Sequence, residues 1–308
     1  MSEERHTATD TRLDLTVPPP NRPKIRAGGI DTRSRRRSIA MHGLLVLAAI
    51  LTLYPLAWMI GSSLKPENQI FTTFSPFPTN FTVRNYVTGW TATGTSFSVY
   101  LVNSAVIALG AVVGNVLSCS FAAYAFARLD FAFKRLWFVL MLGTLMLPFQ
   151  ATLIPQYVLF FKLGWVNTFL PLIVPQFLAE SAFFIFLMVQ FIRGLPKELD
   201  EAASIDGAGP IRVYFSIILP LMRPALITTT VLTFIWTFND FLRQLVYLSD
   251  NSRYTVPLGL NSFVDKAGGS SFGGMLAMSV VTLVPTIVVF MVFQKKLIEG
   301  VATTGVKG

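Results

Sequence analysis

Residues Glu201–Pro220 read "EAASIDGAGPIRVYFSIILP", in which closely spaced acidic residues, alanines and glycines precede an apolar end. They lie within a longer polar connection, Arg193 to Arg223, that separates two long apolar segments. Connections between helices are usually only a few residues long. We therefore expect this connection to contain helices of its own.

The first half of the connection predicts a short helix with an acidic start. Glu198, Asp200 and Glu201 fall in its first turns, where carboxylates favour the helix dipole. Gly207 and Gly209 then end the helix, because glycine adopts the backbone conformation of a helix C-terminus at little cost.

One face of this predicted helix carries Ala202 and Ala203 beside Leu199. Two small side chains let another protein approach almost to backbone distance, and the neighbouring carboxylates can pair with its Arg or Lys residues. This is the pattern of a helix that lies in the groove of a partner protein. The alternative is a helix packed on its own bundle.

The second half predicts another helix, which Pro210 can start and which spans 211–219 before Pro220 stops it. We interpret this second helix as an interfacial helix packed on its own bundle. The side chains expected to face lipid are Ile211, Tyr214, Phe215 and Ile218.

The composition of the whole chain is that of a membrane protein. Of its 308 residues 53% are hydrophobic and 13% charged, and the mean hydropathy is +0.58. Crossing a bilayer takes about 20 apolar residues, and six runs approach this length. We predict an all-α membrane protein with spans at 38–60, 99–123, 136–156, 169–192, 224–248 and 274–293.

The formal charge of +9 reports topology rather than nucleic-acid binding. When the amino terminus is placed inside, most of the 25 Lys and Arg residues fall on the tails and connections of that same side. Basic connections mark the cytoplasmic side of membrane proteins. We therefore expect both termini and the connection 193–223 to be cytoplasmic.

We expect the following organisation along the chain. Residues 1–37 form a basic, disordered tail, and 38–98 hold the first span and an outward segment. Residues 99–294 form the core of the protein and include the connection 193–223. Residues 295–308 form a second cytoplasmic tail.

Catalytic and metal chemistry find few candidates in this sequence. Cys119 is the only cysteine, so a cluster of thiolate ligands is excluded, and His6 and His42 alone do not make a metal site. No G-x-x-x-x-G-K-[ST] phosphate-binding loop occurs. We expect no catalytic residue, metal or cofactor on this chain.

Polar residues inside spans are costly in lipid and are therefore candidates for a transport pathway. Glu180 lies in the fourth predicted span, and Asn239 and Asp240 lie near the outer part of the fifth, with Trp236 beside them. Asp240 and Arg243 are helical neighbours three positions apart. For Glu180 the alternative is a buried carboxyl group paired with a neighbouring helix.

The polar connection resembles the EAA loop of ABC importer permeases. Glu201, Ala202 and Ala203, then Gly207 after three residues and Ile217–Pro220 after nine more, match that pattern without a gap. Other stretches resemble the carbohydrate, maltose-type branch of the family, and the resemblance extends from Met41 to Gly308. These stretches are "SSLKP", "NY", "AYAFARL", "LPKELDEAASIDGA", "FNDFL" and "EGVATTGVKG".

The resemblance implies a type I ABC importer permease with six spans in the bacterial inner membrane. Such a subunit pairs with a second homologous permease, binds two ATPase subunits that use ATP and Mg²⁺, and receives solute from an extracytoplasmic binding protein. The first helix of the loop is then the coupling helix. Its expected ATPase-coupling residues are Glu198, Glu201, Ala202, Ala203, Asp206 and Gly207.

The main rival interpretation is a secondary transporter driven by an ion gradient, which is also a helical bundle with a few buried charges. It needs no ATPase, and the full EAA spacing argues against it. The sequence does not name the solute.

Overall fold

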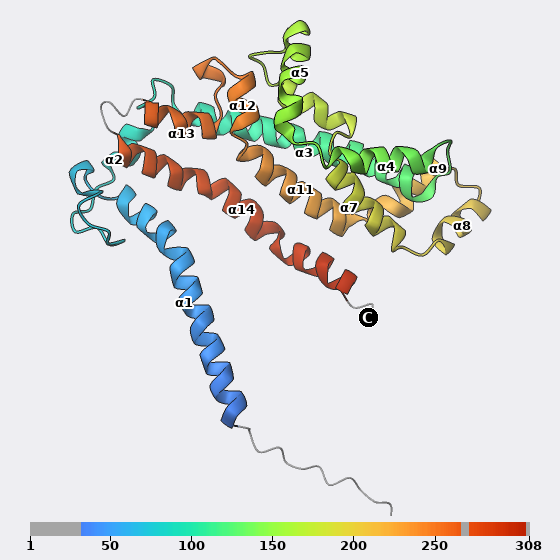
Figure 1. Ribbon diagram of the computed structural model, residues 1–308, viewed down its shortest axis with the longest axis horizontal. Coiled ribbons are helices and arrows are strands. Elements are labelled where there is room, and N and C mark those ends of the chain that lie inside the picture. Colours follow the sequence, from blue (N-terminus) through green and yellow to red (C-terminus); the bar gives the residue numbers. More distant parts are fainter. Residues whose placement is uncertain (1–31, 266–270, 306–308) are drawn as a thin grey trace, which may run out of the picture. The chain divides into compact units, whose positions relative to one another are not determined.

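The computed structural model describes residues 32–265 and 271–305, and every regular element within these ranges is helical (Figure 1). This confirms the predicted all-helical fold class. The chain divides into two compact units, Met1–Leu53 and Tyr54–Gly308. Residues 1–31 of the predicted amino-terminal tail and 306–308 of the predicted carboxy-terminal tail lie outside the described residues.

The helices are named in chain order. The α-helices are α1 (Thr32–Ser63), α2 (Arg84–Gly89), α3 (Phe97–Arg128), α4 (Lys134–Thr144), α5 (Phe149–Lys162), α6 (Leu170–Ile173), α7 (Ala182–Arg193), α8 (Glu198–Ile205), α9 (Pro210–Val213), α10 (Leu219–Leu221), α11 (Arg223–Phe238), α12 (Leu242–Tyr247), α13 (Val256–Asp265) and α14 (Phe272–Gly305). The 3-10 helices are η1 (Glu67–Gln69), η2 (Val174–Leu178) and η4 (Asn251–Arg253), and η3 (Tyr214–Ile218) is a π-helix.

Among the described residues, four helical segments are long and apolar enough to cross a membrane, namely 38–63, 97–128, 170–193 and 272–296. Two further spans arise when each of two bent helix pairs is taken as one, α4 with α5 and the segment 210–221 with α11. The six predicted runs therefore all find a counterpart, but two of the counterparts are bent.

The third predicted span, 136–156, is not one straight helix. The axes of α4 and α5 meet at 100°, and Pro148 precedes the first residue of α5. Proline has no N–H group for the helix ladder and clashes with the preceding turn, which gives the break a local cause. In the fourth span the helix is also interrupted, because Ala179 adopts a left-handed conformation between η2 and α7.

The fifth predicted span, 224–248, is too long at its outer end, since α11 ends at Phe238 and the separate helix α12 follows. The predicted helix 211–219 is helical in the structure, as the consecutive elements α9, η3 and α10. Pro220 does not end this helix as predicted, because it lies inside α10. Ile211 and Phe215 are exposed, whereas Tyr214 and Ile218 are buried in the bundle and cannot face lipid.

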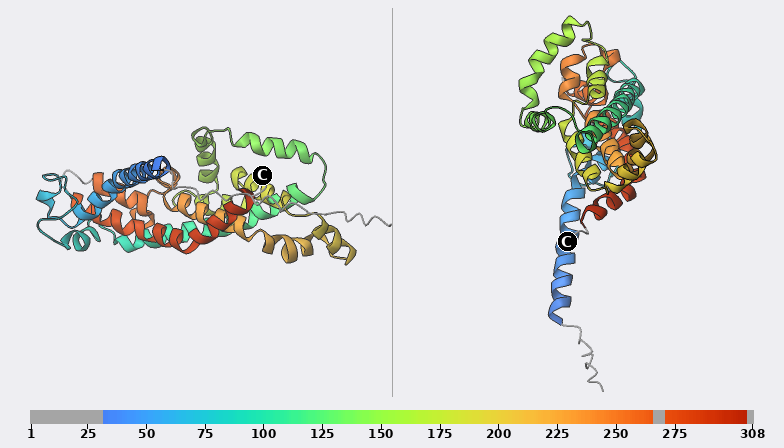
Figure 2. Two further views of the ribbon diagram at one scale, coloured as in Figure 1. Left: turned by 90° about the horizontal axis from the view of Figure 1, so that it is seen from below. Right: turned by 90° about the vertical axis from the view of Figure 1, so that its right-hand side faces the viewer.

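Helix α3 runs through the second unit beside α7 and α11 (Figures 1 and 2). It contributes side chains to all three hydrophobic clusters of this unit. Cys119 and Ala123 belong to the cluster that also holds residues of α7 and α8, and Ile107 packs in the cluster around Tyr247. Phe97 belongs to the third, next to residues of α11 and α14. The core is thus arranged along α3.

Candidate functional site: a polar cavity and an exposed acidic helix

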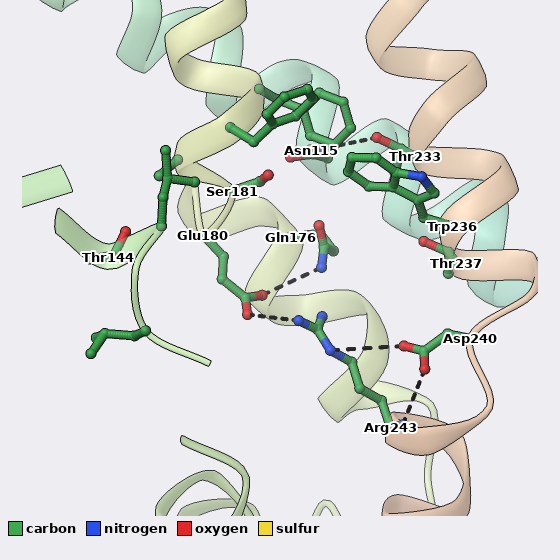
Figure 3. Close-up of a pocket in the computed structure, with 15 residues that line it drawn as sticks. Asn115, Thr144, Gln176, Glu180, Ser181, Thr233, Trp236, Thr237, Asp240 and Arg243 are labelled. Carbon is green, nitrogen blue, oxygen red and sulfur yellow. Dashed lines mark hydrogen bonds and ion pairs between the residues drawn. The ribbon is translucent and has the colours of Figure 1, made fainter. Parts of the chain in front are cut away.

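A cavity of about 420 Å³ opens between α3, α7 and α11 and the turn that joins α4 to α5 (Figure 3). Ligand sites in proteins commonly have this size. Polar and aromatic side chains dominate the lining. Those labelled in Figure 3 are Asn115, Thr144, Gln176, Glu180, Ser181, Thr233, Trp236, Thr237, Asp240 and Arg243.

The cavity brings together three of the four predicted pathway residues, Glu180, Trp236 and Asp240. Asn239 lies outside the lining. Its side chain donates to the Ile235 carbonyl at 2.8 Å and so satisfies the C-terminal end of its own helix, α11.

Arg243 connects the two carboxylates of the cavity. Its guanidinium group lies 3.7 Å from Glu180 Oε1 and 3.8 Å from Asp240 Oδ2, and these three side chains are all about one third exposed (Figure 3). The same group also lies over the Phe149 ring, 4.4 Å from its centroid. Glu180 is therefore paired with a neighbouring helix and lines the cavity at the same time.

The Arg243–Glu180 contact was missed by the sequence analysis, which considered only the local pair of Arg243 and Asp240. A partly buried cation is stabilised by nearby carboxylates that compensate its charge. A basic residue close to a carboxylate at the end of a span was the available signal, but sequence spacing gives no distance between α12 and the turn before α7.

Amide and hydroxyl groups complete the lining. Asn115 donates to Thr233 Oγ1 at 2.7 Å and so joins α3 to α11, while Gln176 donates to Glu180 Oε2 at 3.4 Å. Trp236 is half-exposed and packs against Phe183 and Phe184, with ring centroids 5.6 Å and 5.2 Å away. An aromatic ring beside uncharged donors and acceptors can bind a polyhydroxylated molecule.

The predicted coupling residues lie on α8 and the turn after it. Glu198, Glu201, Ala202 and Asp206 are exposed, and Gly207 is exposed with a φ angle of +76°. Glycine adopts this left-handed conformation without strain. Ala203 differs, because it is buried at 8% exposure in the cluster around α3 and α7. The two alanines therefore have different surroundings, since Ala203 packs within the chain and Ala202 faces outward.

Within residues 32–265 and 271–305, no group of three or more His, Cys, Asp or Glu residues could hold a metal ion.

The polar cavity lies among helices that include candidate membrane spans. Residues 114–302 match the family of binding-protein-dependent transport system inner membrane components, and the chain belongs to that family. It is therefore a multi-pass protein of the inner membrane, and the predicted family is confirmed.

Similar proteins support this assignment over most of the chain. The trehalose/maltose transport system permease protein of Thermococcus litoralis is 36% identical, with 85% of this chain and 94% of that protein aligned. The arabinooligosaccharides transport system permease protein of Halalkalibacterium halodurans is 35% identical over 84% and 93% of the two chains. A chain in the crystal structure of a bacterial ABC transporter involved in the import of the acidic polysaccharide alginate has the same fold, with a TM-score of 0.75 and 21% identity. The match covers 85% of this chain and 97% of that chain.

Proposed function

We propose that the chain is the permease subunit of an ATP-driven importer for a carbohydrate. The relatives from Thermococcus and Halalkalibacterium are named for the transport of saccharides, and the family description names a binding protein on which transport depends. In this proposal a second homologous permease completes the pathway. Two separate ATPase subunits use ATP and Mg²⁺, and an extracytoplasmic binding protein delivers the solute.

The exposed acidic face of α8 is the observation that carries this proposal. Glu198 and Glu201 project from a short helix whose opposite side is anchored through buried Ala203. Carboxylates on an exposed surface attract the basic residues of a partner. Ala202, which is also exposed, allows that partner to approach closely, and Gly207 turns the chain back after the helix. This helix is the proposed docking element for an ATPase subunit.

The cavity beside Trp236 is the proposed cargo pathway within this chain. Its lining offers a ring face, hydroxyl groups and amides, which together bind sugar C–H faces and sugar hydroxyls. Arg243 is already shared between two carboxylates. The cavity thus has no excess of positive charge, which favours a neutral saccharide over an anionic one.

Transport requires the cavity to open to one side of the membrane at a time. ATP binding favours the closed arrangement of the ATPase pair, and α8 moves with the ATPase to which it is docked. Hydrolysis and release reverse this bias. The residues of this chain bind the cargo, transmit the displacement and line the path, whereas bond cleavage in ATP takes place on the partner.

Reconstitution into vesicles tests the proposal. The chain, purified with its partner permease and ATPases, is placed in liposomes with its binding protein, and uptake of labelled maltose, trehalose and arabinooligosaccharides is followed. We expect uptake of one of these sugars to require ATP and to persist when ionophores abolish ion gradients. Uptake without hydrolysis would instead support the ion-gradient alternative, which the family assignment does not support.

A charge reversal at the proposed docking face provides the variant for this test. Glu201→Lys should abolish sugar-stimulated ATP hydrolysis, because it replaces an attraction with a repulsion. Asp130→Lys is the matched control, since Asp130 is a fully exposed acid in the turn between α3 and α4. Equal losses in both variants would show that α8 has no special role.

A further inference from the structure

The displacement of α8 can reach the cavity by two routes, and the covalent one is bent. The covalent route runs from α8 through α9, η3 and α10 into α11, the helix that carries Trp236. The structure places the π-helix η3 in this path and a 75° bend between 210–221 and α11. π-Helical turns and bends interrupt the regular hydrogen-bond ladder. This route is therefore a poor rigid connection.

The second route is non-covalent and begins at Arg128, the last residue of α3. Its Nε atom lies 2.9 Å from Asp200 Oδ2 on α8, and its Nη2 atom donates to the Leu195 carbonyl at 2.9 Å. The Arg128 side chain is only 6% exposed and that of Asp200 23%. One side chain thus holds both α8 and the segment before it.

The Asp200 carboxylate depends on this contact. Both of its oxygens are buried without a hydrogen bond within the described part of the chain, and the Arg128 Nε–H group does not point along a hydrogen bond to Oδ2. The attraction is therefore that of two charges in close contact. A buried carboxylate without a compensating charge is costly, so Arg128 keeps α8 in its position.

Two further polar contacts join α3 to the chain that follows α8. Tyr124 donates to the Pro210 carbonyl at 3.1 Å, and the hydroxyl groups of Ser120 and Tyr214 lie 2.7 Å apart. Together with Arg128, these residues lie on the last turns of one helix. They bind the connection on both sides of the turn at Gly207.

Helix α3 continues from this contact to the cavity and beyond it. Asn115, which lines the cavity, is part of the same unbroken helix, Phe97–Arg128. Near the start of α3, Asn103 donates to the carbonyls of Ser252 and Tyr254 at 3.0 Å and 2.9 Å. Figure 1 shows α8 and α13 at opposite ends of this unit, with α3 between them. An unbroken helix held by contacts near both ends can carry a displacement along its axis.

We propose that Arg128 is a positioning residue that couples α8 to the cavity through α3. The Arg128–Asp200 pair holds the docking helix on the end of α3, so that a displacement of α8 moves the cavity wall at Asn115. This inference rests on the proposed function, because it assumes that an ATPase moves α8. It differs from it in assigning the transmission to α3 rather than to the chain that leads into α11.

The test measures how much sugar is imported for each ATP hydrolysed by the complete transporter in vesicles. The variants are Arg128→Gln, Asp200→Asn, their combination and the conservative Arg128→Lys. Asp130→Asn is the matched control, because the Asp130–Lys134 pair lies in the adjoining turn but does not bind α8. The amount of ATPase that purifies with each variant reports assembly separately.

We expect Arg128→Gln and Asp200→Asn to assemble with the ATPase. Each should import about tenfold less sugar per ATP, because each removes one side of the same ion pair. The double variant should lose no more than either single one, since both remove the same contact. Arg128→Lys should recover part of the coupling by keeping the charge, and Asp130→Asn should match the wild type.

Two results would overturn the inference. One is a normal ratio of sugar to ATP in Arg128→Gln and Asp200→Asn. The other is a loss of ATPase assembly that fully accounts for the lost import while the ratio stays normal, because the pair would then serve assembly alone. Failure of the proposed function is distinct, since the wild-type complex itself would then show no ATP-dependent import.

Discussion

Two of the ion-paired regions among the described residues differ in how closely their charges approach. At the end of α3, Arg128 lies 2.9 Å from Asp200, and both side chains are largely buried. In the cavity, Arg243 lies 3.7 Å and 3.8 Å from its two carboxylates, and each group is about one third exposed. In the first region one cation pairs with one carboxylate, whereas in the cavity one cation is shared between two carboxylates.

The difference in burial separates a contact that is costly to break from one that can exchange partners. Breaking a buried pair leaves a charge without compensation, so such a contact holds its elements together throughout a cycle. A partly exposed pair contributes little, because water replaces the lost partner. In the proposed transport cycle, the cavity groups can therefore rearrange around a cargo while the contact between α3 and α8 stays formed.

The largest expected effect is on stability and compares the two arginines directly. Arg128→Gln should lower the free energy of unfolding by about 3 kcal/mol, because it strands the buried Asp200 carboxylate. Arg243→Gln should lower it by no more than about 1 kcal/mol. Thermal and denaturant unfolding of the purified protein in detergent measures both. Equal losses would remove the distinction between a fixed joint and an exchangeable one.

The next effect concerns cargo affinity. Glu180→Gln removes the ion pair that joins Arg243 to the turn before α7, and we expect the sugar concentration for half-maximal transport to change up to about fivefold. Unfolding should be nearly unchanged. Asp240→Asn is the matched variant, because its amide oxygen can still accept the Arg243 backbone N–H, a contact of 3.2 Å in the wild type.

Kinetics of sugar uptake in vesicles separate these two variants. A similar change in both would mean that the charge of the cavity matters and the Glu180 contact does not. A loss of maximal rate in Glu180→Gln with unchanged half-saturation would assign Glu180 to the motion instead of to the cargo.

A smaller effect is expected at the end of α8, where the backbone and not a charge sets the geometry. Gly207→Ala should destabilise the turn by about 1 kcal/mol, because a φ of +76° strains any residue with a Cβ atom. Space is not the cause, since a Cβ atom there would meet nothing within 4 Å. Reduced sugar-stimulated ATP hydrolysis would report the altered turn.

Gly209→Ala is the control for this change. Gly209 has equally open surroundings, and its φ of −73° is available to alanine. A comparable loss in Gly209→Ala would show that flexibility of the turn, not its left-handed residue, supports coupling.

The sequence predicted the helical fold because spans depend on the length of apolar runs, which lipid requires. It did not predict the orientation of residues within the bundle. Tyr214 and Ile218 satisfy the same periodicity whether their face meets lipid or protein, and only packing against α3 decided it. Pro148 gives the break between α4 and α5 a local cause, but the periodicity of the sequence does not give the 100° between the two helices.

Single residues of the candidate site could be predicted from the sequence, but contacts between residues far apart in the chain could not. Glu180 and Asp240 stood out as charges in apolar runs, and both line the cavity. The contacts of Arg243 with Glu180 and of Arg128 with Asp200 join segments far apart in the chain. Local spacing holds no information on such distances, so these partners required the fold.

The smallest expected effect is at Asp250. This fully exposed acid adds a third case to the buried and the partly exposed carboxylates. Hydrogen bonds from the Ser252 N–H and side chain hold the pKa of Asp250 below its ordinary value, and the Ser252 N–H contact measures 2.9 Å. A lowered folded-state pKa means that the ionised group stabilises the turn at neutral pH. That stabilisation is lost as the pH falls below the ordinary aspartate value of 3.8 and through the folded-state pKa. Asp250→Ala should therefore lower the unfolding temperature slightly at pH 7, and the difference from wild type should shrink in acid.

Asp250→Asn, which keeps an acceptor for Ser252 but does not titrate, should show a smaller difference with less dependence on pH. A difference for Asp250→Ala that persists unchanged at pH 3 would show that the side chain acts by its shape and not by its charge.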